Sequence, residues 1–107
     1  MTEAAQARYD DSIFSDEQHV SRVVDVLKAV AHPARLRIVA VLRDGKRNVN
    51  GLATTLGLNQ AIVSQQLRIL RMCNLVEVTR KGGFAEYRLS EPHLVELLHC
   101  MEGCATQ

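Results

Sequence analysis

The segment from Asn50 to Cys73, NGLATTLGLNQAIVSQQLRILRMC, decides the fold because it predicts two short helices joined by a tight turn. Its first half places apolar residues on one face of a short helix that ends at Gly57. Leu58 and Asn59 supply the turn. The second helix then carries a buried stripe at helical spacing, formed by Val63, Leu67 and Leu70.

The opposite face of the second helix carries hydrogen-bonding and basic side chains and no carboxylate. Glutamine and arginine can each make two hydrogen bonds to base edges in the major groove, and a face without carboxylates does not repel phosphate. The pattern therefore predicts binding to double-stranded DNA. We expect contacts with bases and adjacent phosphates from Gln60, Ser64, Gln65 and Arg68, and a phosphate contact from Arg71 near the helix end.

Charge is distributed unevenly along the chain, although the formal net charge is only +1. Residues 1–27 hold two basic and six acidic side chains, residues 28–88 eleven and three, and residues 89–107 none and three. A basic centre between acidic ends is typical of a DNA-binding segment flanked by helices that do not bind DNA. The alternative is an ordinary solvated surface of mixed charge.

Length and composition favour one small domain. The chain has 107 residues, and we expect residues 15–107 to form a single domain. No apolar run approaches the roughly 20 residues that span a bilayer, and the N-terminus lacks a basic-then-apolar signal. We therefore expect a cytoplasmic protein with no membrane partner. Three cysteines, an odd number, favour reduced thiols or metal ligands over structural disulfides.

Two helices are predicted upstream of the helix-turn-helix. Residues 1–14 show little apolar periodicity, and we expect them to form a mobile N-terminal arm. Ser15 is the expected cap of the first helix, whose apolar face runs to about Ala31. Pro33 suits the first turn of the second helix. This helix is apolar over a wide arc as far as Asp44-Gly45, which is the pattern of a core helix.

A β-hairpin is predicted downstream. Asn74 is expected to end the preceding helix in the left-handed conformation. The expected strands cover residues 75–81 and 84–89, around a turn at Gly82-Gly83. Beside this turn, the residues expected to reach the minor groove or the DNA backbone are Arg80 and Lys81.

A last helix follows the hairpin, with Ser90 as its expected cap and its end near Gly103. The predicted fold is mainly α with a small β-hairpin, a winged helix-turn-helix with an extra helix at each end. The two outer helices carry apolar stripes, at Val20–Val30 and Leu94–Met101, that a chain of this size cannot easily cover alone. These stripes favour a dimer.

Several segments resemble the ArsR/SmtB family of bacterial repressors over about residues 20–103. HPARLRI at His32–Ile38 is similar to the opening of that family's core helix, and Leu58–Arg68 is similar to its recognition helix. The wing and the start of the last helix are matched by Leu75-Val76, Arg80-Lys81-Gly82 and Tyr87-Arg88-Leu89 followed by Ser90-Glu91-Pro92. Gln66 departs from the pattern, since the family commonly has histidine there, and this bears on base preference.

The resemblance implies a homodimer joined through the first and last helices. Such a dimer binds an imperfect palindromic operator upstream of its own operon and is released from DNA by a ligand. The main hypothesis from the sequence is therefore a DNA-binding repressor that requires no cofactor and responds to an inducer.

The last helix holds candidate ligands for a metal inducer. Cys100 and Cys104 are four residues apart and share one face, and Glu91 and His93 stand where the helix starts. In an antiparallel pair of last helices, Glu91 and His93 could approach Cys104 of the second subunit. This set of ligands suits Zn²⁺ or a softer ion.

Some members of the family bind metal across this helix pair through an acidic-x-His pattern followed by His-x-x-His. Glu91 and His93 fit the first half, but the second half falls on Cys104 and Gln107, and glutamine is a poor ligand. Three interpretations of the thiols stay open, namely a metal site, a redox role and purely structural cysteines. Cys73 lacks the second cysteine of the family's soft-metal site at this position, and we expect it to serve in packing.

Nothing in the sequence favours an enzyme. The chain has no glycine-rich phosphate loop, no nucleophile elbow and no His-Glu-x-x-His pattern. Two alternatives to an inducible repressor remain. One is a constitutive winged-helix DNA-binding protein without an inducer, and the other is a winged-helix module that binds a protein through its apolar outer helices.

Overall fold

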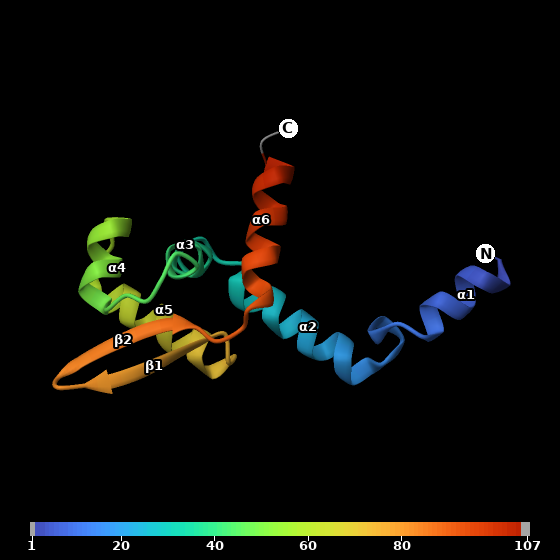
Figure 1. Cartoon of the computed structure of the whole chain (residues 1–107), viewed down its shortest axis with the longest axis horizontal. Coiled ribbons are helices and arrows are strands. Elements are labelled where there is room, and N and C mark those ends of the chain that lie inside the picture. Colours follow the sequence, from blue (N-terminus) through green and yellow to red (C-terminus); the bar gives the residue numbers. More distant parts are fainter. Residues whose placement is uncertain (1, 106–107) are drawn as a thin grey trace.

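The computed structural model describes residues 2–105. Over this range the chain forms six α-helices, one 3₁₀ helix and one two-stranded antiparallel sheet (Figure 1). In chain order the elements are α1 (Glu3–Asp10), η1 (Ile13–Ser15), α2 (Glu17–Val30), α3 (Pro33–Leu42), α4 (Val49–Leu56), α5 (Gln60–Met72), β1 (Val76–Lys81), β2 (Phe84–Leu89) and α6 (His93–Ala105). The predicted winged helix-turn-helix with extra terminal helices is confirmed.

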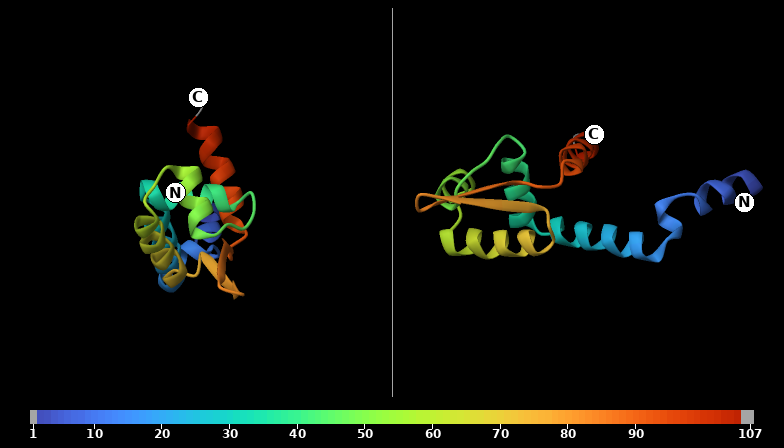
Figure 2. Two further views of the ribbon diagram at one scale, coloured as in Figure 1. Left: turned by 90° about the vertical axis from the view of Figure 1, so that its left-hand side faces the viewer. Right: turned by 60° about the horizontal axis from the view of Figure 1, so that its bottom comes forward.

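The molecule is elongated, with principal extents of 57 × 32 × 20 Å. Helices α3, α4 and α5 gather with the hairpin at one end, and α2 leads away from them toward α1 at the other end (Figure 1). Figure 2 shows the same arrangement from two further sides, and its right view shows α6 apart from the α1 end. No helix within residues 2–105 is long and apolar enough to cross a membrane.

The hydrophobic core is centred on α3, which packs against α2, α4, α5, α6 and β2. Ile38 and Val39 of α3 are fully buried, as the predicted core helix requires. The stripe predicted on α5 is confirmed, because Val63, Leu67 and Leu70 all have no exposed surface. The hairpin and the outer helices complete this core with Leu75, Val76, Tyr87, Leu94, Leu98, Ala29 and Val30.

Left-handed residues end the elements where the sequence predicts. Gly57 (φ 66°) ends α4 before the turn into α5, and Asn74 (φ 60°) follows α5. Between the strands, Gly82 and Gly83 both have positive φ, at 56° and 86°. Two successive positive φ values match the twist of a two-residue hairpin turn, which fixes the antiparallel register from Val76 opposite Leu89 to Lys81 opposite Phe84.

The N-terminal arm contains short helices that the sequence does not predict. Helix α1 and the turn η1 form there, and α1 buries none of its residues. Because α1 has no apolar stripe, periodicity gives no sign of it. The mobility of the arm stays a prediction.

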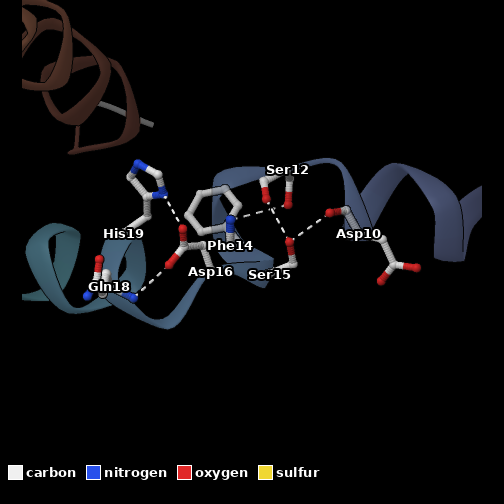
Figure 3. Close-up of polar contacts among 7 residues, drawn as sticks. All are labelled: Asp10, Ser12, Phe14, Ser15, Asp16, Gln18 and His19. Carbon is white, nitrogen blue, oxygen red and sulfur yellow. Dashed lines mark hydrogen bonds and ion pairs between the residues drawn. The ribbon is translucent and has the colours of Figure 1, made fainter.

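The predicted cap of α2 is wrong by one residue. Asp16 caps this helix by accepting a hydrogen bond from the backbone N–H of Gln18 at 2.9 Å. The hydroxyl of Ser15 instead donates to the backbone carbonyls of Asp10 and Ser12, at 2.8 and 2.9 Å (Figure 3). Both residue types are good caps, and the preceding η1 turn engages the serine.

The predicted cap of α6 is also wrong. The Ser90 hydroxyl donates to the backbone carbonyl of Asn74 at 2.9 Å and so ties the end of the hairpin to the end of α5. Glu91 takes the capping role, because its carboxylate accepts from the backbone N–H of His93 at 3.1 Å.

One side chain joins three helices. Arg35, in the first turn of α3, donates from Nε to the backbone carbonyl of Ala29 at 2.6 Å and from Nη2 to that of Lys28 at 3.5 Å. Its Nη1 donates to Oε1 of Gln66 on α5 at 2.9 Å. The guanidinium thus connects the last turn of α2 to α5 through a half-buried site.

We expect Arg35→Lys to lower the free energy of unfolding by about 1–3 kcal/mol, because an ammonium group lacks the forked donors that reach acceptors on both α2 and α5. Urea unfolding at fixed protein concentration measures this change. Arg22→Lys is the matched control, since Arg22 is exposed on α2 and should unfold like the parent. Equal unfolding midpoints for Arg35→Lys and the parent would contradict the role given to the guanidinium.

Candidate nucleic-acid interface

Helix α5 presents its predicted polar face to solvent. Asn59 caps the helix by accepting from the backbone N–H of Ala61 at 2.7 Å, and burial of the apolar stripe turns the other face outward. The side chains predicted to bind DNA from this helix are all exposed, namely Gln60, Ser64, Gln65, Arg68 and Arg71. The geometry of α5 therefore suits insertion into a major groove.

Two glutamines of α5 have specific partners. Gln60 donates from Nε2 to Oδ1 of Asn50, which lies in the first turn of α4, at 2.9 Å. Gln66 is half-buried and accepts from Arg35, so its amide serves the contact between α3 and α5. Gln66 therefore lies on the inner side of α5, whereas its departure from the family pattern predicts an effect on base preference. Asn50 was missed, because its contact depends on how two helices pack.

The hairpin projects from the body as a wing (Figure 1). Arg80 and Lys81 are exposed beside its tip, as predicted. The wing is fixed to the loop before α4 by two backbone hydrogen bonds between Arg47 and Tyr87, at 3.0 and 2.7 Å. The side chain of Tyr87 is buried, so the base of the wing belongs to the core.

The acidic side chains of the basic central segment are all close to a basic partner. Glu77 accepts from Arg88 at 2.9 Å across the hairpin, and a carboxylate oxygen of Glu86 lies 3.6 Å from Nζ of Lys46. The third, Asp44, lies 4.0 Å from Arg43. Within residues 2–105, the interface cations without an ion pair include Arg68, Arg71, Arg80 and Lys81. Their charge is therefore available to phosphate.

The candidate metal ligands at the start and at the end of α6 do not meet within one chain. His93 and Cys104 are separated by about 16 Å along α6 at ~1.5 Å per residue, whereas two ligands of one ion lie within about 4 Å of each other. Cys100 and Cys104 are both exposed. Among residues 2–105 no group of three His, Cys, Asp or Glu side chains could hold an ion. Gln107 lies outside the described residues.

Glu91 and His93 instead bind each other. The Glu91 carboxylate lies 2.6 Å from Nδ1 of the imidazole. The backbone N–H of His93, and then its ring, lower the pKa of the Glu91 carboxyl. The hydrogen bond to Glu91 raises the pKa of the His93 imidazole. The raised pKa of His93 favours the protonated imidazole, and a metal ion would compete with that proton for the ring.

Cys73 is half-buried and packs against the core near the end of α5. This position agrees with the packing role expected for it. It lines a cavity of about 570 Å³ between α2 and α5, together with Ile69, Met72 and Arg35.

Comparisons with known proteins agree with this architecture. Residues 32–78 match the model of the arsR family of bacterial regulatory proteins. The transcriptional regulator NmtR of Mycobacterium tuberculosis is 38% identical over 98 residues, which cover 92% of this chain and 82% of NmtR.

Two solved structures extend the likeness to three dimensions. The transcriptional repressor BigR from Xylella fastidiosa has a TM-score of 0.76 at 29% identity, over 97% of this chain and 96% of that one. Mb0332 from Mycobacterium bovis, described as a homodimeric winged helix-turn-helix DNA-binding domain, has a TM-score of 0.73 at 32% identity and covers 81% of both chains.

The resemblance found in the sequence is thereby confirmed, both in the order of the elements and over nearly the whole length of the chain. The chain belongs to the ArsR family of bacterial regulatory proteins, which are DNA-binding transcriptional regulators and not enzymes.

Proposed function

We propose that this DNA-binding repressor acts as a homodimer, reads a palindromic operator through α5 and is released by an inducer. The observation that carries the proposal is the exposed face of α5, which offers hydrogen-bonding and basic groups without a carboxylate. Gln65 and Arg68 lie on this face one turn apart and are suited to base edges. Arg71, Arg80 and Lys81 supply charge for phosphates on either side.

The outer helices support the dimer. Leu27 of α2 is 47% exposed and Val95 of α6 is 42% exposed. An apolar groove of about 450 Å³ between α2 and α6 is lined by Val23, Leu27, Leu94 and Leu97 among others. A second copy related by a two-fold axis would cover these surfaces and place two α5 helices on one side of the duplex. Such a pair reads half-sites about one helical turn apart, hence a palindrome.

The proposed dimer also bears on the chemistry of the inducer. Because Glu91 and His93 cannot share an ion with Cys104 of the same chain, a metal site needs the last helix of the second copy. Zn²⁺ or a softer ion would suit those ligands. Oxidation of the exposed Cys100 and Cys104 thiols is the other inducing chemistry that the chain offers.

Arg68→Ala is expected to weaken operator binding by about tenfold, ~1.4 kcal/mol, and to relax the preference at one base pair, because a bidentate base contact is lost. Lys81→Ala should weaken binding to all sequences alike and reduce the salt dependence, because it releases fewer counterions. Fluorescence anisotropy with operator and random duplexes across a salt series measures both. Unchanged operator affinity for Arg68→Ala would show that the face is wrongly assigned.

Leu27→Glu is expected to convert the dimer to monomer at micromolar concentration, because it buries a charge in the proposed interface. Sedimentation equilibrium measures the change. Ile62→Glu is the matched control, since Ile62 on α5 is 43% exposed and lies outside the interface. The α2–α6 interface would be refuted by a dimer that survives Leu27→Glu.

Operator binding by the reduced dimer is expected to fall by about tenfold or more with one of Zn²⁺, Cd²⁺, As(III) or a disulfide oxidant, ~1.4 kcal/mol of coupling or more. Anisotropy titrations with each agent measure the effect. Serine at Cys100 and Cys104 should abolish the response, whereas Cys73→Ser should retain it. Binding that no agent changes would favour the constitutive DNA-binding protein, and binding without salt dependence would favour the protein-interaction module.

A further inference from the structure

We propose that Asn50 positions the amide of Gln60 so that Gln60 selects adenine over guanine at one operator base pair. The proposal rests on the function proposed above for the exposed face of α5. Its basis is the hydrogen bond from Nε2 of Gln60 to Oδ1 of Asn50, at 2.9 Å. The two residues lie ten positions apart on different helices, so the contact joins the two halves of the helix-turn-helix.

Both residues of this hydrogen bond lie in the first turn of a capped helix. Asn50 lies in the first turn of α4, where Asn48 caps the helix by accepting from the N–H of Gly51 at 2.7 Å. Leu52 and Ala53, which follow at once, are buried and fix the helix to the core. Gln60 is the first residue of α5, directly after its cap Asn59. The amide of Gln60 is therefore held from the side of α4 while it faces solvent.

The number of free hydrogen-bonding groups gives the base preference. A glutamine amide has two N–H donors and one carbonyl oxygen. Asn50 uses one donor of Gln60, which leaves one N–H and the oxygen. Adenine offers one acceptor, N7, and one donor, the N6 amino group, in the major groove. The remaining groups of Gln60 match this pair.

Guanine requires a different set of groups. Its major-groove edge carries two acceptors, N7 and O6, so a side chain that binds both needs two donors. Gln60 has only one donor left while Asn50 holds the other. Loss of Asn50 frees the amide to rotate and to offer both N–H groups. Asn50 is in this sense a specificity-determining residue that acts through Gln60, without itself contacting a base.

The test uses the full-length dimer and an operator selected from random duplexes, with every half-site position varied in turn. Gln60→Ala first identifies the base pair that Gln60 reads, as the position where discrimination disappears. At that position we expect Asn50→Ala to lower the preference for adenine over guanine by about fivefold or more. Its melting temperature and the slope of affinity against salt concentration should stay at the parent values, because Asn50 is exposed.

Three further variants sharpen the test. Asn50→Asp keeps the acceptor oxygen, so it should retain the adenine preference while its charge lowers affinity for every sequence. Thr55→Ala, another exposed position on α4, is the matched control and should leave both quantities unchanged. The double variant Asn50→Ala with Gln60→Ala should discriminate no worse than Gln60→Ala alone.

The outcomes separate this inference from the proposed function. If neither Gln60→Ala nor Arg68→Ala alters discrimination at any position, the assignment of the α5 face fails and the inference fails with it. If Gln60→Ala relaxes one position and Asn50→Ala leaves that position unchanged, only the positioning role is overturned. Additive losses in the double variant would also overturn it, since Asn50 would then contact DNA independently.

Discussion

The three hydrogen bonds of the Arg35 guanidinium are the constraint on which the rest of the structure depends. They close the α2–α3 corner through the carbonyls of Lys28 and Ala29, and they hold α5 at that corner through Gln66. A guanidinium has five N–H donors in a fixed fork and can serve all three acceptors at once, and lysine could not replace it. The direction of α5 relative to α2 is therefore fixed by one side chain as well as by apolar packing.

Much of the fold could be predicted because local sequence patterns mark most of its elements. Helix α5 has a complete apolar stripe, and Gly57, Asn74 and Gly82-Gly83 mark places where the backbone must turn. Helix α1 was missed for the opposite reason, since it has no buried face to produce a period. Its signals were an alanine-rich composition and the Thr2 cap, which depend on intrinsic propensity. The predicted caps at Ser15 and Ser90 are wrong because both hydroxyls donate to backbone carbonyls outside the helix. The neighbouring acids Asp16 and Glu91 accept the helix N–H groups instead.

Some features of the candidate site could likewise be predicted from the sequence, and others could not. Exposure of Gln65, Arg68 and Lys81 follows from the positions of buried residues, so the sequence could predict it. The inward position of Gln66 and the contact between Asn50 and Gln60 depend on how helices pack, which no spacing encodes. The thiols of α6 stay unassigned for a further reason. If they belong to a site shared by two copies of the chain, as proposed above, that site depends on an interface, and one chain would contain only half of it.

The attachment of the wing to the loop before α4 has a mechanical consequence. Arg47 and Tyr87 exchange two backbone hydrogen bonds, and the buried ring of Tyr87 makes the wing and the helix-turn-helix one stiff unit. In the proposed inducible dimer, a signal received at the outer helices would therefore have little freedom to reshape a single DNA-reading unit. It would instead change the spacing and tilt between the two units of that dimer. The wing tips, farthest from the pivot, would travel farthest, so a slight rotation could take both units out of register with successive turns of the duplex.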